Sequence, residues 1–399
     1  MMDLAGKFWR GSGVVRFGSQ VAWEGLTRYC PTDPDKVPAS AARISPQWLN
    51  AVLCRDTPGA EITEIDVTGG SDGTNTRRAL RVGYNEAGMA AGLPTELFVK
   101  SATAMRTRMM NTLTTRGESE VIFYQSMRPR LPIEAPRAIY AGFDRSSGRM
   151  LIIFPNMAAA GTRFLDPSHH VTREQAEGMI DLLAGYQSAT WNSPELRSSR
   201  SFPTTLRYQE LINVRALPFE KRGAVGLDRA ARVMPDALNR IDRNRLWRLH
   251  MASIKRLEKR AHVLTHYDMH VGNWYITGDG RMGLTDWSMR FGHWSADLTY
   301  MLLSALRIED RRAWERDLLK RYREQLASGG VKDGLPSDDE VWAEYRRQTF
   351  HPLYFWLTTI GAGVLQPDMQ PDHISLANLE RMGQAMVDLD SFSAIEEVM

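Results

Sequence analysis

The chain has 399 residues, of which 43% are hydrophobic and 24% charged, and its 50 basic and 47 acidic residues leave a net charge of +3. This length favours two domains over one compact core, and the balanced charge gives no case for nucleic acid as a partner. The two cysteines, Cys30 and Cys54, exclude a disulfide framework and a cysteine-rich zinc module.

Targeting signals are not evident in the sequence. Residues 1–10 contain no apolar stretch long enough for a signal peptide, and no run approaches the ~20 apolar residues of a membrane helix. We therefore expect a cytoplasmic protein that has no membrane partner. The sequence gives no indication of an oligomeric state.

The first third of the chain is predicted to be an arm followed by a helix and strands. Residues 1–43 form the arm, in which aromatic residues are scattered among glycine and polar residues. Ser45 and Pro46 indicate a helix start, because serine caps a helix and proline suits its first position. Strands are predicted over 61–67 and 79–84.

A glycine-containing hairpin is predicted between these two strands, over residues 69–75. Such a hairpin is either an ordinary turn or a place where backbone N–H groups approach phosphates closely. Gly70, Ser71 and Gly73 are therefore candidate phosphate contacts.

Lys100 ends the next predicted strand, 97–100. Alone, it would be read as a solvated strand end, but after a glycine hairpin it suits a cation that holds phosphates. The helix predicted over 117–127 carries two possible partners, Glu118 and Glu120. Either could instead be a solvated helix charge, an interpretation that suits Glu118 better than Glu120. Two more strands are predicted, over 139–141 and 150–154.

The second half of the sequence is predicted to be helical. Thr172 and Gln175 form a capping box that starts a helix reaching about residue 190. The arginine-rich segment 206–261 is interpreted as a solvated helix face, with a nucleic-acid surface as the weaker alternative. The dense apolar segment 350–357 is predicted to lie mostly in the core.

One segment concentrates the chemistry of the chain: His266-Tyr267-Asp268-Met269-His270-Val271-Gly272-Asn273, followed by Asp286-Trp287. Residues 274–276 and 282–285 read as two strands of a hairpin that turns at 278–280. This hairpin would bring Asp286 beside Asn273, with Asp268 at the mouth of the loop. An amide and a carboxylate oxygen suit Mg²⁺, and Asp268 is then free to accept a proton.

This pattern resembles the catalytic and metal-binding loops of the aminoglycoside phosphotransferase and choline kinase superfamily. Within that superfamily the chain is most similar to the ecdysteroid-kinase-like branch. The resemblance implies an α+β, two-lobed protein-kinase-like fold. Its small antiparallel β-sheet N-lobe would span 44–155 and its larger, mainly helical C-lobe 156–399.

The resemblance also implies roles for individual residues. Asp268 would be the catalytic base, and Asn273 and Asp286 would hold Mg²⁺. His266 and His270 would shape the loop, and Asp297 would support it through hydrogen bonds. Tyr267 stands where relatives usually carry glycine.

The nucleotide site follows from the same resemblance, with ATP and Mg²⁺ as cofactors. The pattern Glu-x-x-Phe-Tyr favours Glu120 over Glu118 as the partner of Lys100. A hinge at Phe154-Pro155-Asn156-Met157 would bind adenine through backbone groups, and Met157 would pack on the ring.

The predicted function is an ATP- and Mg²⁺-dependent kinase that phosphorylates a hydroxyl group of a small molecule. The acceptor is predicted to be a neutral or anionic, fairly apolar alcohol. The alternatives are an aminoglycoside-type antibiotic kinase and a non-catalytic nucleotide-binding protein. A protein kinase is disfavoured because Trp287-Ser288, not Phe-Gly, follows Asp286. A binuclear metallohydrolase would need further metal-ligand clusters, and His169-His170, His262 and His293 show no recognised spacing.

Overall fold

The computed structural model describes residues 17–72, 75–199, 201–215, 218–260, 262–363 and 370–399. The chain divides into two units: Met1–Pro129 with Pro136–Ala160, and Arg130–Ala135 with Gly161–Met399. The first unit thus includes the described part of the predicted arm and continues past residue 155 to Ala160. The short segment Arg130–Ala135 belongs to the second unit, which no local sequence pattern indicated.

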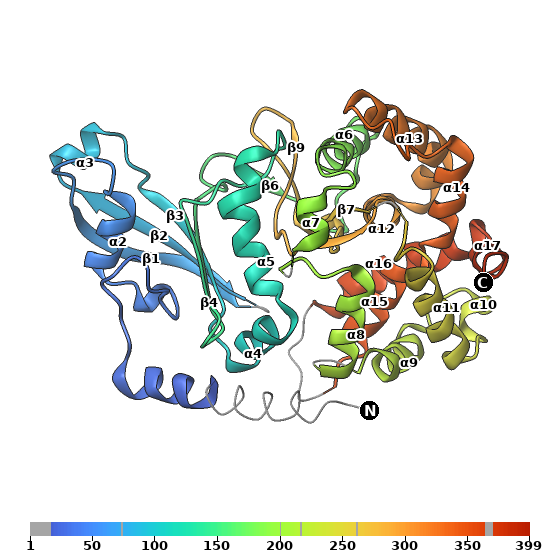
Figure 1. Ribbon diagram of the computed structural model, residues 1–399, viewed down its shortest axis with the longest axis horizontal. Coiled ribbons are helices and arrows are strands. Elements are labelled where there is room, and N and C mark those ends of the chain that lie inside the picture. Colours follow the sequence, from blue (N-terminus) through green and yellow to red (C-terminus); the bar gives the residue numbers. More distant parts are fainter. Residues whose placement is uncertain (1–16, 73–74, 200, 216–217, 261, 364–369) are drawn as a thin grey trace. The chain divides into compact units, whose positions relative to one another are not determined.

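The first unit is built on a five-stranded antiparallel sheet of order β1-β2-β3-β5-β4 (Figure 1). The strands are β1 (Ile62–Asp72), β2 (Thr76–Tyr84), β3 (Glu96–Ser101), β4 (Tyr140–Asp144) and β5 (Arg149–Pro155). The α-helices are α2 (Pro46–Leu53), α3 (Glu86–Ala90), α4 (Met105–Thr114) and α5 (Arg116–Ile122), and residues 17–27 are also helical. Three short turns of 3₁₀ or π type complete it: Ala41–Arg43, Phe123–Met127 and Arg128–Arg130.

The core of the first unit lies between α2 and the sheet. The Ser45 hydroxyl accepts the Trp48 N–H at 3.1 Å, and Pro46 occupies the first helical position, as predicted. This cap directs Trp48 and Leu49, both fully buried, into the core. Alternate residues of the central strands meet them there, because successive strand side chains point to opposite faces. These strand residues are Leu80, Val82, Leu97, Val99, Leu151 and Ile153.

The predicted loop at 69–75 is mostly strand, which corrects the sequence interpretation. The ladder between β1 and β2 continues through Gly70 opposite Arg78, Ser71 opposite Arg77 and Asp72 opposite Thr76. An ion pair of 3.0 Å between Arg78 and Asp72 ties the two strands together near the turn. Gly70 permits this register, because a Cβ there would collide with the Arg77 carbonyl oxygen. Gly73 lies outside the described residues.

The second unit is mainly helical and contains two small antiparallel sheets. One pairs β7 (His262–Thr265) with β10 (Arg290–His293), and the other has the order β6 (Arg163–Phe164), β8 (Trp274–Ile276), β9 (Met282–Leu284). A 3₁₀ turn, Val271–Asn273, precedes β8. The helices are α6 (Arg173–Ala189), α7 (Pro194–Ser198), α8 (Thr205–Arg215), α9 (Phe219–Ala230), α10 (Asp236–Asn239), α11 (Arg243–Lys255), α12 (Ser295–Ala305), α13 (Ile308–Ser328), α14 (Asp338–Arg347), α15 (Phe350–Ile360), α16 (Asp372–Asp388) and α17 (Ser391–Glu396).

The core of the second unit forms around α12, every residue of which is buried. This helix packs against α6, α13, α14, α15 and α16. The predicted capping box of Thr172 and Gln175 starts α6. The apolar segment 350–357 forms α15 and is largely buried, as predicted, although Phe355 is partly exposed.

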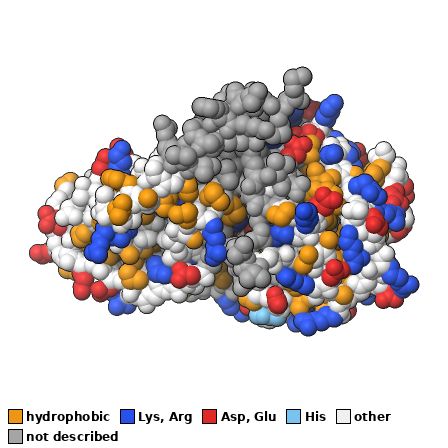
Figure 2. Space-filling view, turned by 90° about the horizontal axis from the view of Figure 1, so that it is seen from below, with side chains coloured by type: hydrophobic (Ala, Val, Ile, Leu, Met, Phe, Trp, Pro, Cys, Tyr) orange, Lys and Arg blue, Asp and Glu red, His pale blue; other side chains and the backbone are white. Residues whose placement is uncertain are grey.

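The arginine-rich segment is only partly the solvated face that its charge density predicted. On the face shown in Figure 2, basic and acidic side chains are interspersed and do not form a patch of one sign. Exposed ion pairs of its arginines are Arg240 with Asp236 and Arg243 with Asp228, both within the segment, and Arg245 with Glu396 of α17. Two of its arginines lie inside instead: Arg256 pairs with buried Glu344, and Arg222 is itself buried.

The predicted α+β class is confirmed, with a small unit built on an antiparallel sheet and a larger, mainly helical unit. None of the described helices is both long enough and apolar enough to span a membrane.

Candidate active site

The loop 266–273 joins β7 to β8. Its first two residues are held by hydrogen bonds to the buried carboxylate of Asp297. One Asp297 oxygen accepts the backbone N–H of His266 at 2.6 Å, and the other accepts that of Tyr267 at 2.9 Å. The Tyr186 hydroxyl donates a third hydrogen bond at 2.6 Å. Burial raises the Asp297 pKa to about 6, and these hydrogen bonds oppose the rise. The supporting role predicted for Asp297 is therefore confirmed by its hydrogen bonds.

The imidazole of His266 links this loop to the segment that leads into Asp286. Its Nδ1 accepts the Asp268 backbone N–H at 3.3 Å, which assigns the ring proton to Nε2. Nε2 then donates to the Thr285 carbonyl oxygen at 2.8 Å. Burial lowers the His266 pKa to about 4, so the ring is neutral at pH 7. His266 is thus a structural link and not a proton carrier.

The hairpin predicted from the sequence brings Asn273 and Asp286 together. Trp274 pairs with Leu284 across β8 and β9, and the Thr285 N–H donates to the Asn273 carbonyl at 2.9 Å. The Asn273 amide nitrogen donates to the Asp268 carbonyl at 2.7 Å. Its Oδ1 is therefore the remaining acceptor of that side chain. Three of the predicted site residues lie in one hydrogen-bonded unit.

Two non-glycine residues of this region have left-handed backbone conformations: Tyr267 at φ 70° and Asp286 at φ 66°. Such conformations cost about 1–3 kcal/mol each and persist only where the surroundings fix them. The Tyr267 N–H is held by Asp297, and the Asp286 carbonyl accepts the Ser288 N–H at 2.8 Å. The two strained residues thus lie beside the predicted base, Asp268, and at the predicted metal ligand, Asp286.

The Tyr267 side chain is buried in the second unit. Its ring centroid lies 5.3 Å from that of Tyr208, 4.5 Å from that of His351 and 5.2 Å from that of Phe355. The left-handed backbone explains why glycine suits this position. In this protein a buried tyrosine occupies the position, and its ring packs against His351 and Phe355 of α15.

The Asp268 carboxylate is the accessible group of the loop. Its side chain is 30% exposed, and its Oδ1 lies 3.8 Å from His270 Nε2. Burial raises the pKa of Tyr300 well above its ordinary value. The negative charge of Asp268 and a hydrogen bond between the Asp268 and Tyr300 side chains raise it further. Sequence reasoning missed Tyr300. Its position on α12, three residues after Asp297 and on the same helix face, was the available signal.

Asn273 Oδ1 and the Asp286 carboxylate are donors that fit Mg²⁺. They are hard oxygen ligands, of which one is charged, and Mg²⁺ completes such a shell with phosphate oxygens and water. The described residues contain no group of three or more His, Cys, Asp or Glu side chains that could hold a metal.

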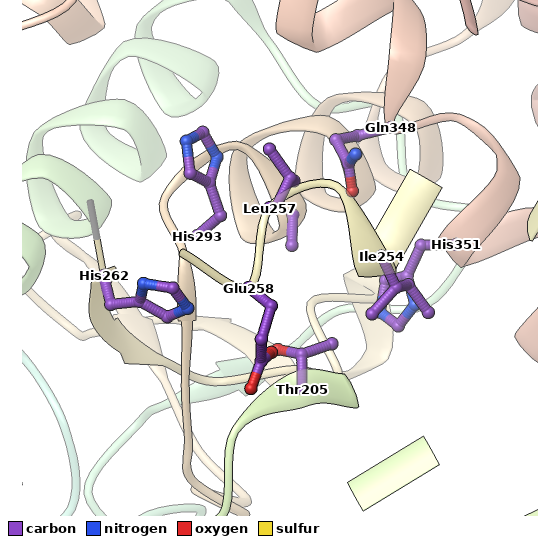
Figure 3. A pocket seen from close by; sticks show the side chains of 9 residues that line it. Thr205, Ile254, Leu257, Glu258, His262, His293, Gln348 and His351 are labelled. Carbon is purple, nitrogen blue, oxygen red and sulfur yellow. The ribbon is translucent and has the colours of Figure 1, made fainter. Parts of the chain in front are cut away.

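The histidines that a metallohydrolase would need are dispersed in the described structure. His170 pairs with Asp310 at 2.8 Å, and His293 bonds Ser295 at 2.7 Å. His262 and His293 line a pocket with His351 and Glu258, but their rings point in different directions (Figure 3). This arrangement disfavours the metallohydrolase alternative.

In the first unit, Lys100 lies on β3 and pairs with Glu120 of α5. The Lys100 Nζ is 2.6 Å from Glu120 Oε1, and the two side chains are 5% and 3% exposed. Glu118 pairs instead with Arg145 at the surface. Of the two candidates, Glu120 is thus the partner of Lys100. Their role toward a nucleotide stays a prediction.

The predicted adenine-binding segment lies at the end of β5 and just beyond it. Phe154 is buried, with its ring 4.8 Å from that of Tyr124. The Asn156 N–H donates to the Glu96 carbonyl, and the Met157 carbonyl accepts the Ala160 N–H. These two backbone groups are already used within the first unit. Binding of adenine by Phe154 and Met157 stays a prediction.

Comparison with known proteins identifies the family to which the chain is similar. The family described as "Phosphotransferase enzyme family" matches residues 108–337. No curated protein matches the chain.

Several solved structures are similar over most of their length. Choline kinase LicA from Streptococcus pneumoniae is 13% identical with a TM-score of 0.45, covering 82% of this chain and 94% of that one. The GDP complex of aminoglycoside 2′-phosphotransferase-IIIa is 11% identical with a TM-score of 0.46, covering 86% and 99%. A microcompartment-associated aminopropanol kinase is 10% identical with a TM-score of 0.46, covering 88% and 99%. Such distant likenesses carry no argument about the acceptor, and the narrower resemblance to the ecdysteroid-kinase-like branch stays a prediction.

Proposed function

The chain belongs to the phosphotransferase enzyme family and is a small-molecule phosphotransferase, and from this premise we propose that its phosphoryl donor is Mg-ATP. We propose further that its acceptor is a hydroxyl group of a fairly apolar alcohol that is neutral or anionic. The observation that carries the proposal is the hydrogen-bonded unit of loop 266–273 and the hairpin that follows it. This unit holds one accessible carboxylate, Asp268, beside two oxygen donors, Asn273 and Asp286.

Asp268 is the proposed base. The acceptor hydroxyl gives its proton to the Asp268 carboxylate while its oxygen forms a bond to the γ-phosphorus of ATP. The bond from that phosphorus to the β–γ bridging oxygen breaks, and ADP leaves. Asp297 holds the backbone N–H groups of His266 and Tyr267, and the His266 ring holds that of Asp268, so the carboxylate is positioned before substrate binds. Phosphoryl transfer depends mainly on such positioning and on charge neutralisation.

Asn273 and Asp286 are the proposed Mg²⁺ ligands. When bound, Mg²⁺ neutralises negative charge on the phosphates of the nucleotide. The Asn273 side chain is oriented by its bond to the Asp268 carbonyl, and Asp286 by the turn that its left-handed backbone imposes. Both ligands thus have an orientation set by the protein.

Lys100 is proposed to hold phosphates of the nucleotide. Its ion pair with Glu120 fixes the position of the ammonium group in a buried setting. Gly70 and Ser71 belong to the β1–β2 ladder, so we do not extend the phosphate-binding role to their backbone.

The test is ADP release from Mg-ATP across a panel of hydroxylated small molecules, with Asp268→Asn as the control. The proposal predicts stimulation by one chemical group and its loss in the variant. If Mg-ATP raises the melting temperature but no acceptor is phosphorylated, a non-catalytic nucleotide-binding protein becomes the better description. Absence of any nucleotide effect contradicts the proposal.

A further inference from the structure

One face of α12 follows the loop that carries the proposed base. Asp297, Tyr300 and Ser304 are spaced three and four residues apart, so they lie on the same side of this helix. Asp297 accepts the backbone N–H groups of His266 and Tyr267. The first turn of α12 therefore holds the start of the loop.

The same helix face continues along the loop beyond Asp268. The Ser304 hydroxyl accepts the Val271 N–H at 3.0 Å and donates in turn to Asn378 Oδ1 of α16 at 2.6 Å. Tyr300 lies one turn before Ser304, and its hydroxyl forms a hydrogen bond with the Asp268 side chain. Contacts on both sides of Tyr300 along the helix thus fix its place opposite Asp268.

The Tyr300 hydroxyl is the donor of this hydrogen bond. Burial raises the Tyr300 pKa well above its ordinary value, so the hydroxyl keeps its proton at pH 7 and a carboxylate accepts from it. The residue is 2% exposed, and its ring packs edge-on against that of His351, with 6.1 Å between the ring centroids. The ring is therefore held in one place, with the Asp268 carboxylate as the acceptor of its hydroxyl.

A fixed backbone does not by itself orient a carboxylate. The His266 ring holds the Asp268 backbone N–H, but the torsion that turns the two carboxylate oxygens of an aspartate is broad. A donor on the buried side restricts this torsion, and a hydrogen bond to a carboxylate is a strong one. The Asp268 side chain is still 30% exposed, so part of the carboxylate remains open to an acceptor. A base needs this arrangement, because proton transfer requires an oxygen at hydrogen-bond distance from the hydroxyl.

We propose that Tyr300 is a positioning residue for phosphoryl transfer: its hydroxyl, held on α12 between Asp297 and Ser304, orients the Asp268 carboxylate toward the hydroxyl of the acceptor. This inference rests on the proposed kinase function and adds a residue to its machinery. Asp297 and Ser304 hold backbone N–H groups of the loop, whereas Tyr300 holds the reacting side chain itself.

The contact is tested first, because its test requires no turnover. The urea midpoint of unfolding is measured for Tyr300→Phe in the wild type and in Asp268→Ala, which removes the acceptor. Tyr300→Phe should lower the midpoint in the wild type, since it breaks a charge-assisted hydrogen bond, and should not lower it in Asp268→Ala. Tyr345→Phe is the matched control, because its buried hydroxyl donates to Glu315 at 3.0 Å. It should lower the midpoint equally in both backgrounds.

Turnover then shows whether the contact serves the base. With the acceptor that the panel of hydroxylated molecules identifies, kcat should fall by about 10- to 100-fold in Tyr300→Phe, because a misplacement of about 1 Å costs up to that much. The dissociation constant of Mg-ATP should stay within about twofold. In Asp268→Asn, where the base is gone, adding Tyr300→Phe should lower transfer no further. Tyr345→Phe should transfer at the wild-type rate.

The possible results separate this inference from the proposed function. A wild-type kcat in Tyr300→Phe overturns the positioning role, and so does an equal loss of transfer in the wild-type and Asp268→Asn backgrounds, which indicates a general structural defect. Equal midpoint shifts in the wild type and Asp268→Ala overturn the contact itself. Transfer by Asp268→Asn at the wild-type rate, or no transfer to any acceptor, instead contradicts the proposed function and the positioning role together, and the midpoints then show whether the contact exists.

Discussion

His266 Nε2 lies 2.8 Å from the carbonyl oxygen of Thr285 and donates a hydrogen bond to it. The same ring accepts the backbone N–H of Asp268 through Nδ1. One neutral imidazole therefore sets the distance between the segment of the proposed base and the segment of the proposed metal ligand Asp286.

This link predicts a combined defect for His266→Ala. Removing the ring leaves the Thr285 carbonyl and the Asp268 N–H without partners, so both segments lose their positions. Turnover and Mg-ATP affinity should each fall by about 10- to 100-fold, as for residues that orient metal ligands. Steady-state kinetics and calorimetric titration with Mg-ATP measure the two effects. His170→Ala, at an exposed position of the same unit, is the control. Wild-type affinity in His266→Ala would show that the link has no functional role.

The buried pair of Lys100 and Glu120 predicts a strong effect on stability. Glu120→Gln removes one partner of a buried ion pair, which typically costs about 3–5 kcal/mol. Glu118→Gln is the matched control on the same helix, because its partner Arg145 is largely exposed and such pairs contribute about 0–1 kcal/mol. Chemical unfolding of both variants measures the difference. Similar losses in the two variants would contradict the assignment of Glu120 as the buried partner.

The metal assignment predicts a selective effect of Asp286→Ala. Loss of the charged ligand should weaken the binding of Mg-ATP by at least about tenfold, since charge-assisted contacts contribute about 1.5–3 kcal/mol. Asp279→Ala is the control, because this exposed carboxylate lies on the turn of the same hairpin and pairs with Arg281. Equal nucleotide affinity in the wild type and Asp286→Ala would contradict the assignment.

His351 predicts a pH dependence of stability. It is buried beside Tyr267 and lines the pocket of Figure 3, and neither of its ring nitrogens has a hydrogen-bond partner in the described structure. Burial lowers its pKa from 6.5 to about 3. The unfolded chain therefore binds a proton below pH 6.5 that the folded chain does not bind until about pH 3. Because each pKa unit corresponds to about 1.4 kcal/mol, several kcal/mol of stability are lost as pH falls through this window.

Replacing the ring isolates this contribution from those of other buried histidines. His351→Phe keeps an aromatic ring against Tyr267 and removes the titrating group. The free energy of unfolding, followed by urea titration from pH 7 to pH 4, should fall less steeply with acid in the variant. Parallel pH profiles for the variant and the wild type would show that His351 does not stay neutral in the folded protein.

The site was largely predictable from the sequence because its chemistry is local. Asp268, Asn273 and Asp286 lie in one short segment, a loop followed by a hairpin, so short-range turn and strand signals place them together. Residues 69–75 were not predictable in the same way. Glycines there read as a loop, yet pairing with β2 extends β1 through Asp72, and cross-strand pairing is not visible in a local pattern.

Burial between helices was the second feature that the sequence did not reveal. Arg222 stands among many arginines, most of which suit a solvated face, and charge density alone does not separate them. It lies where two helices meet closely, which glycines at Gly226 on α9 and at Gly361, just after α15, allow. Tyr300, which forms a hydrogen bond with Asp268, was also missed, and its one signal in the sequence was its spacing of three residues from Asp297.

The central claim is that Asp268 accepts the proton of an acceptor hydroxyl while Mg-ATP is held by other residues. The most direct test is the parallel measurement of phosphoryl transfer and Mg-ATP affinity in the wild type and in Asp268→Asn. General-base catalysis contributes about 10²–10⁴-fold, so transfer should fall by that factor or more while the dissociation constant of Mg-ATP stays within about twofold. Transfer by Asp268→Asn at the wild-type rate would contradict the account.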